Sequence, residues 1–259
     1  MPDRMDYSKL DQPGILSFVF YPREDWTPLP SGATDHSVSV AKDVSIGCRL
    51  YTAARTGPSI LFFHGNGEVV YDYDGIAPFY KRLGINLFVA DYRGYGRSTG
   101  TPSFASTVAD AHAIFRYFRD TLPKDGYTGP FFVMGRSLGS LSAVELASSY
   151  PEDLKGLIIE SGFASAARLL SYLNVVFQSA YIDEFEKASL DRIRSITIPV
   201  LIIHGEWDEI IPHDQAQILY DNVGSKRKKL LTVPGAGHND MLVLGMQQYF
   251  AAIKEFVFS

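Results

Sequence analysis

The segment "FFVMGRSLGSLSAVELA", from Phe131 to Ala147, changes its residue pattern at Ser137. Before the serine the residues are apolar and favour a β-strand, and after it the apolar residues recur at helical spacing. Gly135 and Gly139 flank the serine. The segment therefore predicts a strand, a tight turn that carries Ser137, and a helix.

The same alternation of short apolar runs and amphipathic stretches extends over most of the chain. Wholly apolar runs are typical of strands that helices cover on both faces. The runs are Ser59–Phe63, Asn86–Ala90, Phe131–Gly135, Gly156–Glu160, Pro199–Gly205 and Lys229–Val233. Helix candidates such as Ser103–Asp120 lie between them. This order predicts an α/β fold with an open, mainly parallel, doubly wound sheet.

The residues before Ser59 follow another pattern. Ile15–Phe20 is a β-like run, and the proline- and glycine-rich stretch Tyr21–Gly32 predicts a loop. His36–Lys42 and Val44–Tyr51 are β-rich and predict an antiparallel pair of strands. The chain has 259 residues, which is within the range of one large α/β unit, so we expect a single domain over residues 1–259.

Sheets of this type place functional groups at the carboxyl ends of their strands. Ser137 lies at such an end, inside a Gly-Arg-Ser-Leu-Gly motif that matches the G-x-S-x-G nucleophile elbow. In an elbow a strained turn projects the serine hydroxyl, and strand and helix approach so closely that Cβ atoms on either side have no room. Gly135 and Gly139 meet that requirement. The pattern predicts that Ser137 is a nucleophile.

A serine hydroxyl needs a neighbouring base and a group that orients the base. His238 lies in "VPGAGHND" directly after the last predicted strand, and Asp208 lies in "HGEWDEIIP" directly after the preceding one. Both are therefore expected at the same edge of the sheet as Ser137. The order Ser137, Asp208, His238 predicts a Ser-His-Asp catalytic triad.

From about Ser59 to the C-terminus the sequence resembles the serine α/β hydrolases. Besides the order of the triad, the segments "FHGNG" (residues 63–67) and "DYRGYGRSTG" (residues 91–100) are typical of the esterase and peptidase-like branches. The resemblance implies an oxyanion hole of two backbone N–H groups, those of Leu138 and, by match to the HG-x motif, Asn66. They would stabilise the charge that develops on a carbonyl oxygen under attack.

Other residues compete for these roles. Glu160 ends a predicted strand and is an alternative acid, because some members of this superfamily take the acid from that strand. Asp208 has the structural alternative of capping a helix that begins near Pro212. His64 and His204 each precede a glycine after a strand, and we expect them to bind loop backbone rather than to act as the base.

The composition argues against several classes of function. A formal net charge of −5 disfavours general binding to nucleic acid or anionic lipid, and the basic run at residues 226–229 is expected to be solvated. The single Cys48 cannot form an intramolecular disulfide. Because His36, His112 and His213 lack partners at metal-ligand spacing, and no phosphate-binding glycine motif is present, we predict neither a metal nor a cofactor.

The N-terminal sequence "MPDRMDYSKLDQPG" lacks the apolar core of a signal peptide. No run approaches the ~18 apolar residues of a membrane-spanning helix. We therefore expect a cytoplasmic protein without a membrane span, and the sequence leaves its oligomeric state open.

These features predict a hydrolase that cleaves a carboxylic ester or a thioester of a small-molecule acyl substrate through an acyl-enzyme. An amidase or peptidase and a carbon–carbon hydrolase are alternatives on the same triad. A non-catalytic ligand receptor or pseudoenzyme on the same scaffold is the alternative from a different class, and the intact triad argues against it.

Residues 161–198 occupy the usual place of a cap in this superfamily, and their number predicts a small one. An apolar stripe at helical spacing runs through this segment, formed by Leu169, Leu170, Leu173, Val176 and Phe177. The stripe either packs a helix onto the edge of the sheet or roofs a compact acyl pocket above Ser137. In both cases we expect short acyl groups to fit better than long ones.

Overall fold

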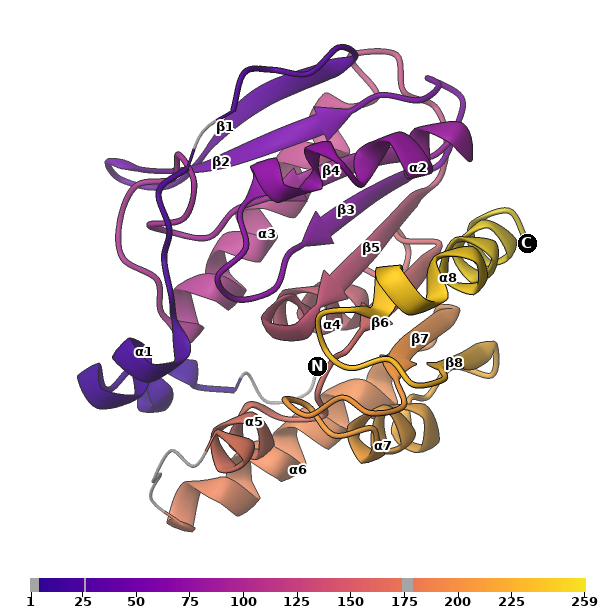
Figure 1. Ribbon diagram of the computed structural model, residues 1–259. Helices are drawn as coiled ribbons and strands as arrows, with labels where there is room; N and C mark the ends of the chain where they lie inside the picture. Colours follow the sequence, from indigo (N-terminus) through magenta and orange to yellow (C-terminus); the bar gives the residue numbers. More distant parts are fainter. Residues whose placement is uncertain (1–4, 26, 174–178) are drawn as a thin grey trace.

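The computed structural model describes residues 5–25, 27–173 and 179–259. Within these residues the centre of the fold is an eight-stranded sheet with the order β1-β2-β4-β3-β5-β6-β7-β8 (Figure 1). Its strands are β1 (Ala33–Ala41), β2 (Val44–Tyr51), β3 (Ser59–Phe63), β4 (Asn86–Ala90), β5 (Phe131–Arg136), β6 (Gly156–Glu160), β7 (Val200–Gly205) and β8 (Lys228–Val233). β2 is antiparallel to β1 and β4, and the other neighbours are parallel.

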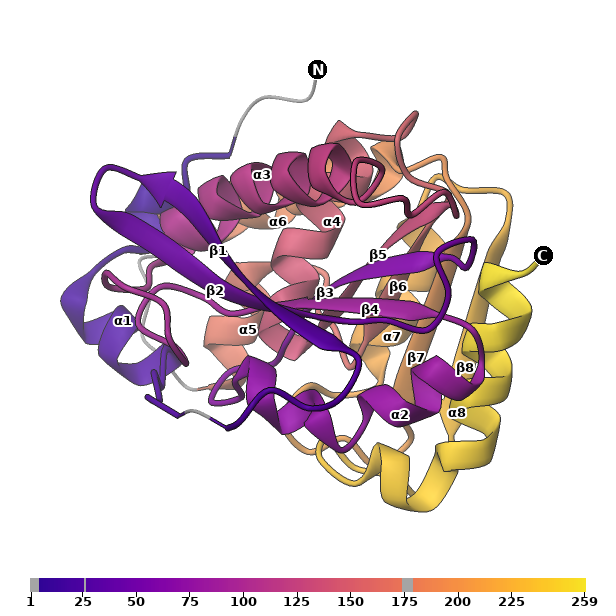
Figure 2. The same ribbon diagram turned by 90° about the horizontal axis from the view of Figure 1, so that it is seen from above.

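Helices cover both faces of this sheet. Figure 2 shows α3, α4 and α6 on one face and α2 and α8 on the other. The helices are α1 (Pro13–Val19), α2 (Ala77–Arg82), α3 (Phe104–Thr121), α4 (Ser140–Ser149), α5 (Ala166–Tyr172), α6 (Ser179–Ser195), α7 (Asp214–Asn222) and α8 (Met241–Val257). The rings of Phe79 and Phe250 stack with their centroids 5.3 Å apart and join α2 to α8. The prediction of a mainly parallel, doubly wound sheet is confirmed.

The apolar runs of the sequence become the inner strands. Every residue of β3, β4, β6 and β7 is buried, which is the reason that these strands carry so few polar side chains. The predicted antiparallel pair is present as β1 and β2, with a register shift between Ser39 and Ala41. β1 and β8 form the two edges of the sheet, and both are more exposed than the strands between them.

The prediction of a β-like run at Ile15–Phe20 is wrong, because most of this run lies in helix α1. Pro13 stands at the start of the helix, where its fixed φ angle favours the helical conformation. Ile15 and Val19 lie one helical turn apart and are both buried, whereas Phe18 is 49% exposed. A short apolar run fits either periodicity, and the proline decides between them here.

The parallel strands all have their carboxyl ends on the same side of the molecule. The predicted site residues lie in the segments that directly follow these strand ends. A short 3-10 helix, η3 (Ser137–Gly139), follows β5 directly. Asp208 lies in the loop after β7, and His238 lies between β8 and α8. The topology therefore brings three distant parts of the sequence together.

Candidate active site

Ser137 occupies the sharp turn between β5 and α4. Its φ angle is +50°, in the left-handed region that residues other than glycine rarely adopt. A Cβ atom on Gly135 would collide with the carbonyl oxygen of Gly139, and one on Gly139 would collide with the carbonyl oxygen of Phe63. The glycines therefore meet the steric requirement of an elbow that projects a serine hydroxyl.

The structure brings the three predicted triad side chains within hydrogen-bond distance. His238 Nε2 lies 3.1 Å from Ser137 Oγ, and His238 Nδ1 lies 2.7 Å from Asp208 Oδ2. All three residues are buried, with exposed fractions of 8%, 4% and 6% for Ser137, His238 and Asp208. This relay has the geometry that nucleophilic catalysis by a serine requires.

Asp208 is held in place by backbone and by a second histidine. Its Oδ1 accepts hydrogen bonds from the backbone N–H groups of Ile210 (3.0 Å) and Ile211 (2.8 Å), and His204 Nε2 lies 3.3 Å from Oδ2. Burial acts to raise the pKa of Asp208, but the hydrogen bonds from His204, His238 and Ile211 hold it well below the ordinary 3.8. The carboxylate is therefore charged. Because α7 begins only at Asp214, capping a helix is not its role.

His64 and His204 contact loop backbone as predicted. His64 Nδ1 lies 2.7 Å from the carbonyl oxygen of Gly65, and His204 Nε2 lies 2.8 Å from that of Ile211. Both rings are fully buried. These contacts fix the two imidazoles against the loops, whereas the ring of His238 lies against Ser137.

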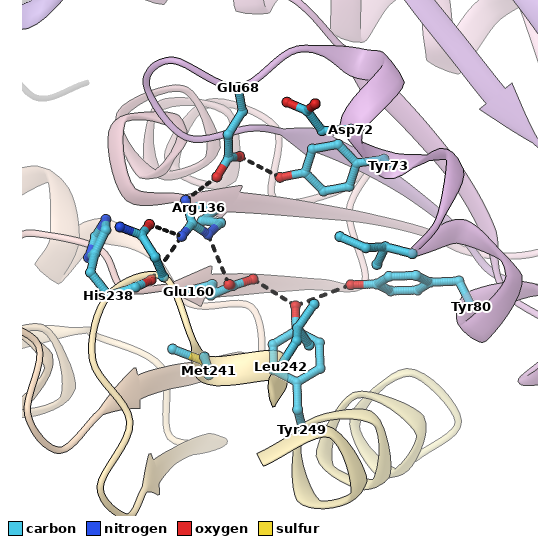
Figure 3. Close-up of a pocket in the computed structure, with 12 residues that line it drawn as sticks. Glu68, Asp72, Tyr73, Tyr80, Arg136, Glu160, His238, Met241, Leu242 and Tyr249 are labelled. Atoms are coloured by element: carbon cyan, nitrogen blue, oxygen red, sulfur yellow. Dashed lines mark hydrogen bonds and ion pairs between the residues drawn. The ribbon is translucent and has the colours of Figure 1, made fainter. Parts of the chain in front are cut away.

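Glu160 belongs to a different network, centred on Arg136 (Figure 3). Arg136 Nε donates to Glu160 Oε1 over 3.2 Å, and Nη1 is paired with the Glu68 carboxylate. Arg136 Nη2 donates to the backbone oxygen of His238 over 2.8 Å and to Asn239 Oδ1 over 3.0 Å. Sequence reasoning missed this network, because its members are separated along the chain and no motif connects them.

Glu160 is almost completely buried in this network. Its Oε2 accepts a hydrogen bond of 2.6 Å from the Tyr249 hydroxyl. Burial raises the pKa of Glu160 above the ordinary 4.5, although Arg136 and Tyr249 oppose the rise. Glu160 is thus bonded to an arginine and a tyrosine, whereas the imidazole of His238 is bonded to Asp208.

A cavity of about 250 Å³, here called the nucleophile cavity, opens beside Ser137. It is lined by Phe18, Val19, Tyr21, Asn66, Arg136, Ser137, Leu138, Leu169, Leu173, Ile210, His238 and Asn239. Both residues predicted for the oxyanion hole are in this set. Leu169 and Leu173 of the predicted stripe also line it, and Leu170 is fully buried. Val176 and Phe177 lie outside the described residues.

The segment around α1 forms one wall of the nucleophile cavity, which the sequence did not suggest. The side chain of Asn66 fastens this wall. Its Oδ1 accepts hydrogen bonds from the Tyr21 backbone N–H (3.0 Å) and the Tyr95 hydroxyl (2.6 Å), and its Nδ2 donates to the backbone oxygen of Val19. Asn66 therefore connects the loop after β3 to the N-terminal segment.

The described ranges hold no group of three or more His, Cys, Asp or Glu side chains arranged to bind a metal ion. In the same part of the chain, no helix combines the length and the apolar character needed to cross a membrane.

Comparison with known proteins identifies the family. The sequence profile of the family described as "Serine aminopeptidase, S33" matches residues 55–181 and 180–242. The chain belongs to this family of α/β hydrolases. Protein bem46 of Schizosaccharomyces pombe is 34% identical over 205 residues, which cover 77% of this α/β hydrolase and 67% of the relative. Alpha/beta hydrolase domain-containing protein 17C of Mus musculus is 31% identical over 258 residues, which cover 95% and 75%.

Solved structures agree on the fold. The esterase Pf2001 of Pyrococcus furiosus superimposes with a TM-score of 0.73 over 92% of this α/β hydrolase and 98% of that chain, at 17% sequence identity. Similarity at this level of identity shows a common fold. The predicted α/β-hydrolase fold is therefore confirmed.

Proposed function

We propose that this α/β hydrolase is a serine hydrolase that cleaves a carboxylic ester or a thioester through an acyl-enzyme. Ser137 is the nucleophile, His238 the base and Asp208 the orienting acid. The main support is the continuous relay of hydrogen bonds, 3.1 Å from Ser137 to His238 and 2.7 Å from His238 to Asp208. The strained turn at Ser137 supports the same assignment, because strain of this kind concentrates at functional sites.

The geometry suggests how each group acts. Asp208 accepts a hydrogen bond from Nδ1–H of His238, so that Nε2 is free to take the proton of Ser137 as Oγ attacks the carbonyl carbon. The backbone N–H groups of Leu138 and Asn66 stabilise the oxyanion. His238 then gives the proton to the leaving oxygen or sulfur, and a water molecule hydrolyses the acyl-enzyme by the same route.

The nucleophile cavity supplies a place for the acyl chain. Apolar side chains from three segments line it, those of α1, of α5 with Leu173, and of the loop that carries Ile210. Each methylene that enters gains about 0.8 kcal/mol of burial until the space is filled. We take residues 161–198 as a small cap within one domain, and Leu169 and Leu173 as its contribution to the roof.

The descriptions of similar proteins point to both amide and ester substrates. The family takes its description from serine aminopeptidases, whereas the superimposed Pyrococcus furiosus protein is named as an esterase. An amidase or peptidase therefore stays the second candidate. Matched esters and anilides of one acyl group separate the two, because an amidase would cleave the anilide as well as the ester, whereas an esterase would leave the anilide intact. A carbon–carbon hydrolase and a cytoplasmic location stay predictions from the sequence.

A fluorophosphonate probe tests the proposal directly, because it phosphonylates an activated serine. The wild-type chain should be labelled on the peptide that carries Ser137, and Ser137→Ala should take up no label. The same two proteins should then be assayed on esters, thioesters and anilides. A folded wild-type chain that takes up no label and cleaves none of these compounds would instead support a non-catalytic receptor.

A further inference from the structure

Tyr95 contacts the loop after β3, residues 64–67, here called the oxyanion loop. Its side chain is fully buried, and its ring packs against those of Tyr92 and His64 with centroid distances of 5.6 and 5.8 Å. The hydroxyl donates to Asn66 Oδ1 over 2.6 Å and accepts the backbone N–H of Tyr21 over 2.9 Å. One buried hydroxyl therefore connects the oxyanion loop to the N-terminal segment.

We propose that the Tyr95 hydroxyl positions the oxyanion hole, and that the hole is complete only when the N-terminal segment up to Tyr21 is in place. Tyr95 acts through the side chain of Asn66, whose backbone N–H is one of the two proposed donors. Tyr95 is absent from the described lining of the nucleophile cavity, so it is a positioning residue rather than a catalytic one. The inference rests on the proposed serine hydrolase function.

The backbone of the oxyanion loop needs support from outside the loop. Gly65 and Gly67 flank Asn66, and glycine loses more conformational freedom on ordering than any other residue. Gly67 has a φ angle of +74°, in the left-handed region. An oxyanion donor is effective only if it is held in position before the reaction. The direction of the Asn66 N–H therefore depends on the contacts that hold the Asn66 side chain.

The Asn66 backbone N–H is available to a substrate. The neighbouring N–H of Gly65 is already bonded to Glu68 Oε2 over 2.8 Å. Within the part of the chain that the structure describes, the Asn66 N–H has no hydrogen-bond partner. Asn66 lines the nucleophile cavity together with Ser137. An unpartnered N–H beside the nucleophile is what an oxyanion hole requires.

Three contacts hold the Asn66 side chain. Oδ1 accepts hydrogen bonds from the Tyr95 hydroxyl and from the Tyr21 N–H, and Nδ2 donates to the Val19 carbonyl oxygen. The Tyr21 N–H is shared between Asn66 Oδ1 and the Tyr95 oxygen, so the three groups form a closed triangle. Burial raises the pKa of Tyr95, although hydrogen bonds from the backbone of Tyr21 and Gly67 oppose the rise. The hydroxyl therefore stays protonated and keeps its bond to Asn66.

The N-terminal segment enters this arrangement through its backbone. The Val19 carbonyl and the Tyr21 N–H lie at the end of α1, which is anchored in the core by Ile15 and Val19. Loss of the Tyr21 N–H would therefore loosen Asn66 without removing a side chain from the oxyanion loop. Proline at position 21 removes this N–H, and the extended backbone of Phe20, with ψ of 125°, suits a following proline.

A double-mutant cycle on one ester tests the route through Asn66. Asn66→Ala keeps the backbone N–H but removes the anchored side chain, and should lower kcat by about 100-fold, as for the loss of one oxyanion donor. Tyr95→Phe keeps the packed ring and should lower kcat by about tenfold through a misplaced donor. The double variant should lose little more than Asn66→Ala alone, rather than the roughly thousandfold of two independent losses.

Tyr127→Phe is the matched control for Tyr95→Phe. Its hydroxyl is also buried, lies 2.7 Å from Thr52 Oγ1 and is absent from the described lining of the nucleophile cavity. The control should leave kcat unchanged. A tenfold loss in Tyr127→Phe as well would show that any missing buried hydroxyl has this effect, and the inference would fail.

A transition-state analogue separates the oxyanion hole from stability. When a trifluoromethyl ketone binds, Ser137 Oγ bonds to the carbonyl carbon, the π pair of the carbonyl moves to its oxygen, and His238 takes the serine proton. The matched trifluoromethyl alcohol forms no oxyanion. Tyr95→Phe and Tyr21→Pro should weaken the ketone by the factor by which each lowers kcat/KM, and should leave the alcohol unchanged relative to their controls. Tyr21→Ala, which keeps the N–H, is the control for proline and should affect ketone and alcohol equally.

The outcomes are distinct. A Tyr95→Phe variant that loses only free energy of unfolding, with kcat/KM and ketone affinity unchanged, would make the hydroxyl purely structural and overturn the inference. Losses that multiply in the double variant would exclude the route through Asn66. If Tyr95→Phe does not fold, the ratio of ketone to alcohol affinity in Tyr21→Pro against Tyr21→Ala decides. A wild-type chain that takes up no fluorophosphonate and cleaves no ester would contradict the proposed function itself.

Discussion

Arg136 Nη2 donates a hydrogen bond of 2.8 Å to the backbone carbonyl oxygen of His238. Arg136 precedes the proposed nucleophile, so one side chain connects the elbow to the loop that carries the proposed base. The same guanidinium is paired with Glu68, in the loop after β3, and with Glu160, at the end of β6. The guanidinium of Arg136, whose side chain is 12% exposed, therefore joins the elbow, two loops and the end of β6.

Replacement of Arg136 by methionine should lower both stability and turnover. A buried carboxylate that loses its partner costs about 3–5 kcal/mol, and His238 loses its backbone anchor. Urea unfolding and kcat measure the two effects. Arg119→Met is the control, because its exposed ion pairs are worth at most about 1 kcal/mol. The double variant with Glu160→Gln should recover part of the stability, and no recovery would argue against an uncompensated charge.

Removal of the proposed nucleophile or of the proposed base should abolish turnover. Ser137→Ala or His238→Ala alone should lower kcat by about 10⁶-fold, the loss seen where a triad acts as a unit. Circular dichroism should show an unchanged fold, because neither substitution adds volume to the core. Substantial hydrolysis by folded Ser137→Ala would remove Ser137 as the nucleophile.

Two variants, each of which replaces a carboxyl side chain by the matching neutral amide, test which residue is the acid of the triad. Asp208→Asn should lower kcat by about 10⁴-fold, because the amide favours the wrong imidazole tautomer. Glu160→Gln should cost far less, since Glu160 bonds to Arg136 and Tyr249 rather than to the imidazole. The reverse ranking of the two variants in kcat would move the acid to Glu160.

The same carboxyls should respond to pH in opposite directions. Burial raises the pKa of Glu160 above 4.5, so its protonated form is favoured by folding. The contribution of Glu160 to the free energy of unfolding is greatest below pH 4.5 and is lost as pH rises through the folded-state pKa. The unfolding free energy of the wild type relative to Glu160→Gln should therefore fall as the pH rises above 4.5.

Asp208 provides the internal comparison for that measurement. Its pKa is held below 3.8, so its contribution is present above pH 3.8 and is lost as pH falls through the folded-state pKa. The free energy of unfolding of the wild type should exceed that of Asp208→Asn at neutral and high pH. This difference should disappear as the pH falls into the acid range. A difference independent of pH for both variants would contradict the assigned environments.

The size of the nucleophile cavity predicts a preference among acyl groups. Soluble esters from acetate to hexanoate should be cleaved faster than palmitate esters, because burial stops when the space is filled. Leu169→Ala enlarges the cavity and should move the optimum to longer chains by about two carbons. Leu242→Ala, which enlarges a different cavity, lined also by Tyr80 and Tyr249 and not by Ser137, should leave the acyl optimum in place. A kcat/KM that climbs steadily to palmitate in the wild type would contradict a bounded pocket.

The sheet was predictable because burial on both faces demands apolar strands. The six apolar runs from Ser59 onward all form strands. The residues proposed for the triad lie in the segments after the carboxyl ends of β5, β7 and β8. Periodicity carried less information at the N-terminus, where the short apolar run of α1 fits either a strand or a helix. Pro13 at the start of α1 and the burial of Ile15 and Val19 on one side of the helix distinguish the two.

The network around Arg136 could not be predicted for a different reason. Glu68 and Glu160 are charged residues at the ends of distant segments, and a solvated charge has the same appearance in a sequence as a buried ion pair. The wall formed by Val19 and Tyr21 depends likewise on a long-range contact, made by the side chain of Asn66. Local sequence patterns identify helices and strands. The partners of a buried ion pair or of a long-range hydrogen bond depend instead on how distant segments come together in the fold.

The two exposed strands of the sheet have a consequence for association between molecules. An edge strand offers unpaired backbone groups to the strands of other chains, and lysines and irregular register oppose such pairing. β8 opens with Lys228 and Lys229, and the Lys229 side chain keeps 49% of its exposure. At the opposite edge the register of β1 shifts between Ser39 and Ala41. By this principle we expect the lysines of β8 and the register shift of β1 to oppose edge-to-edge pairing of folded chains.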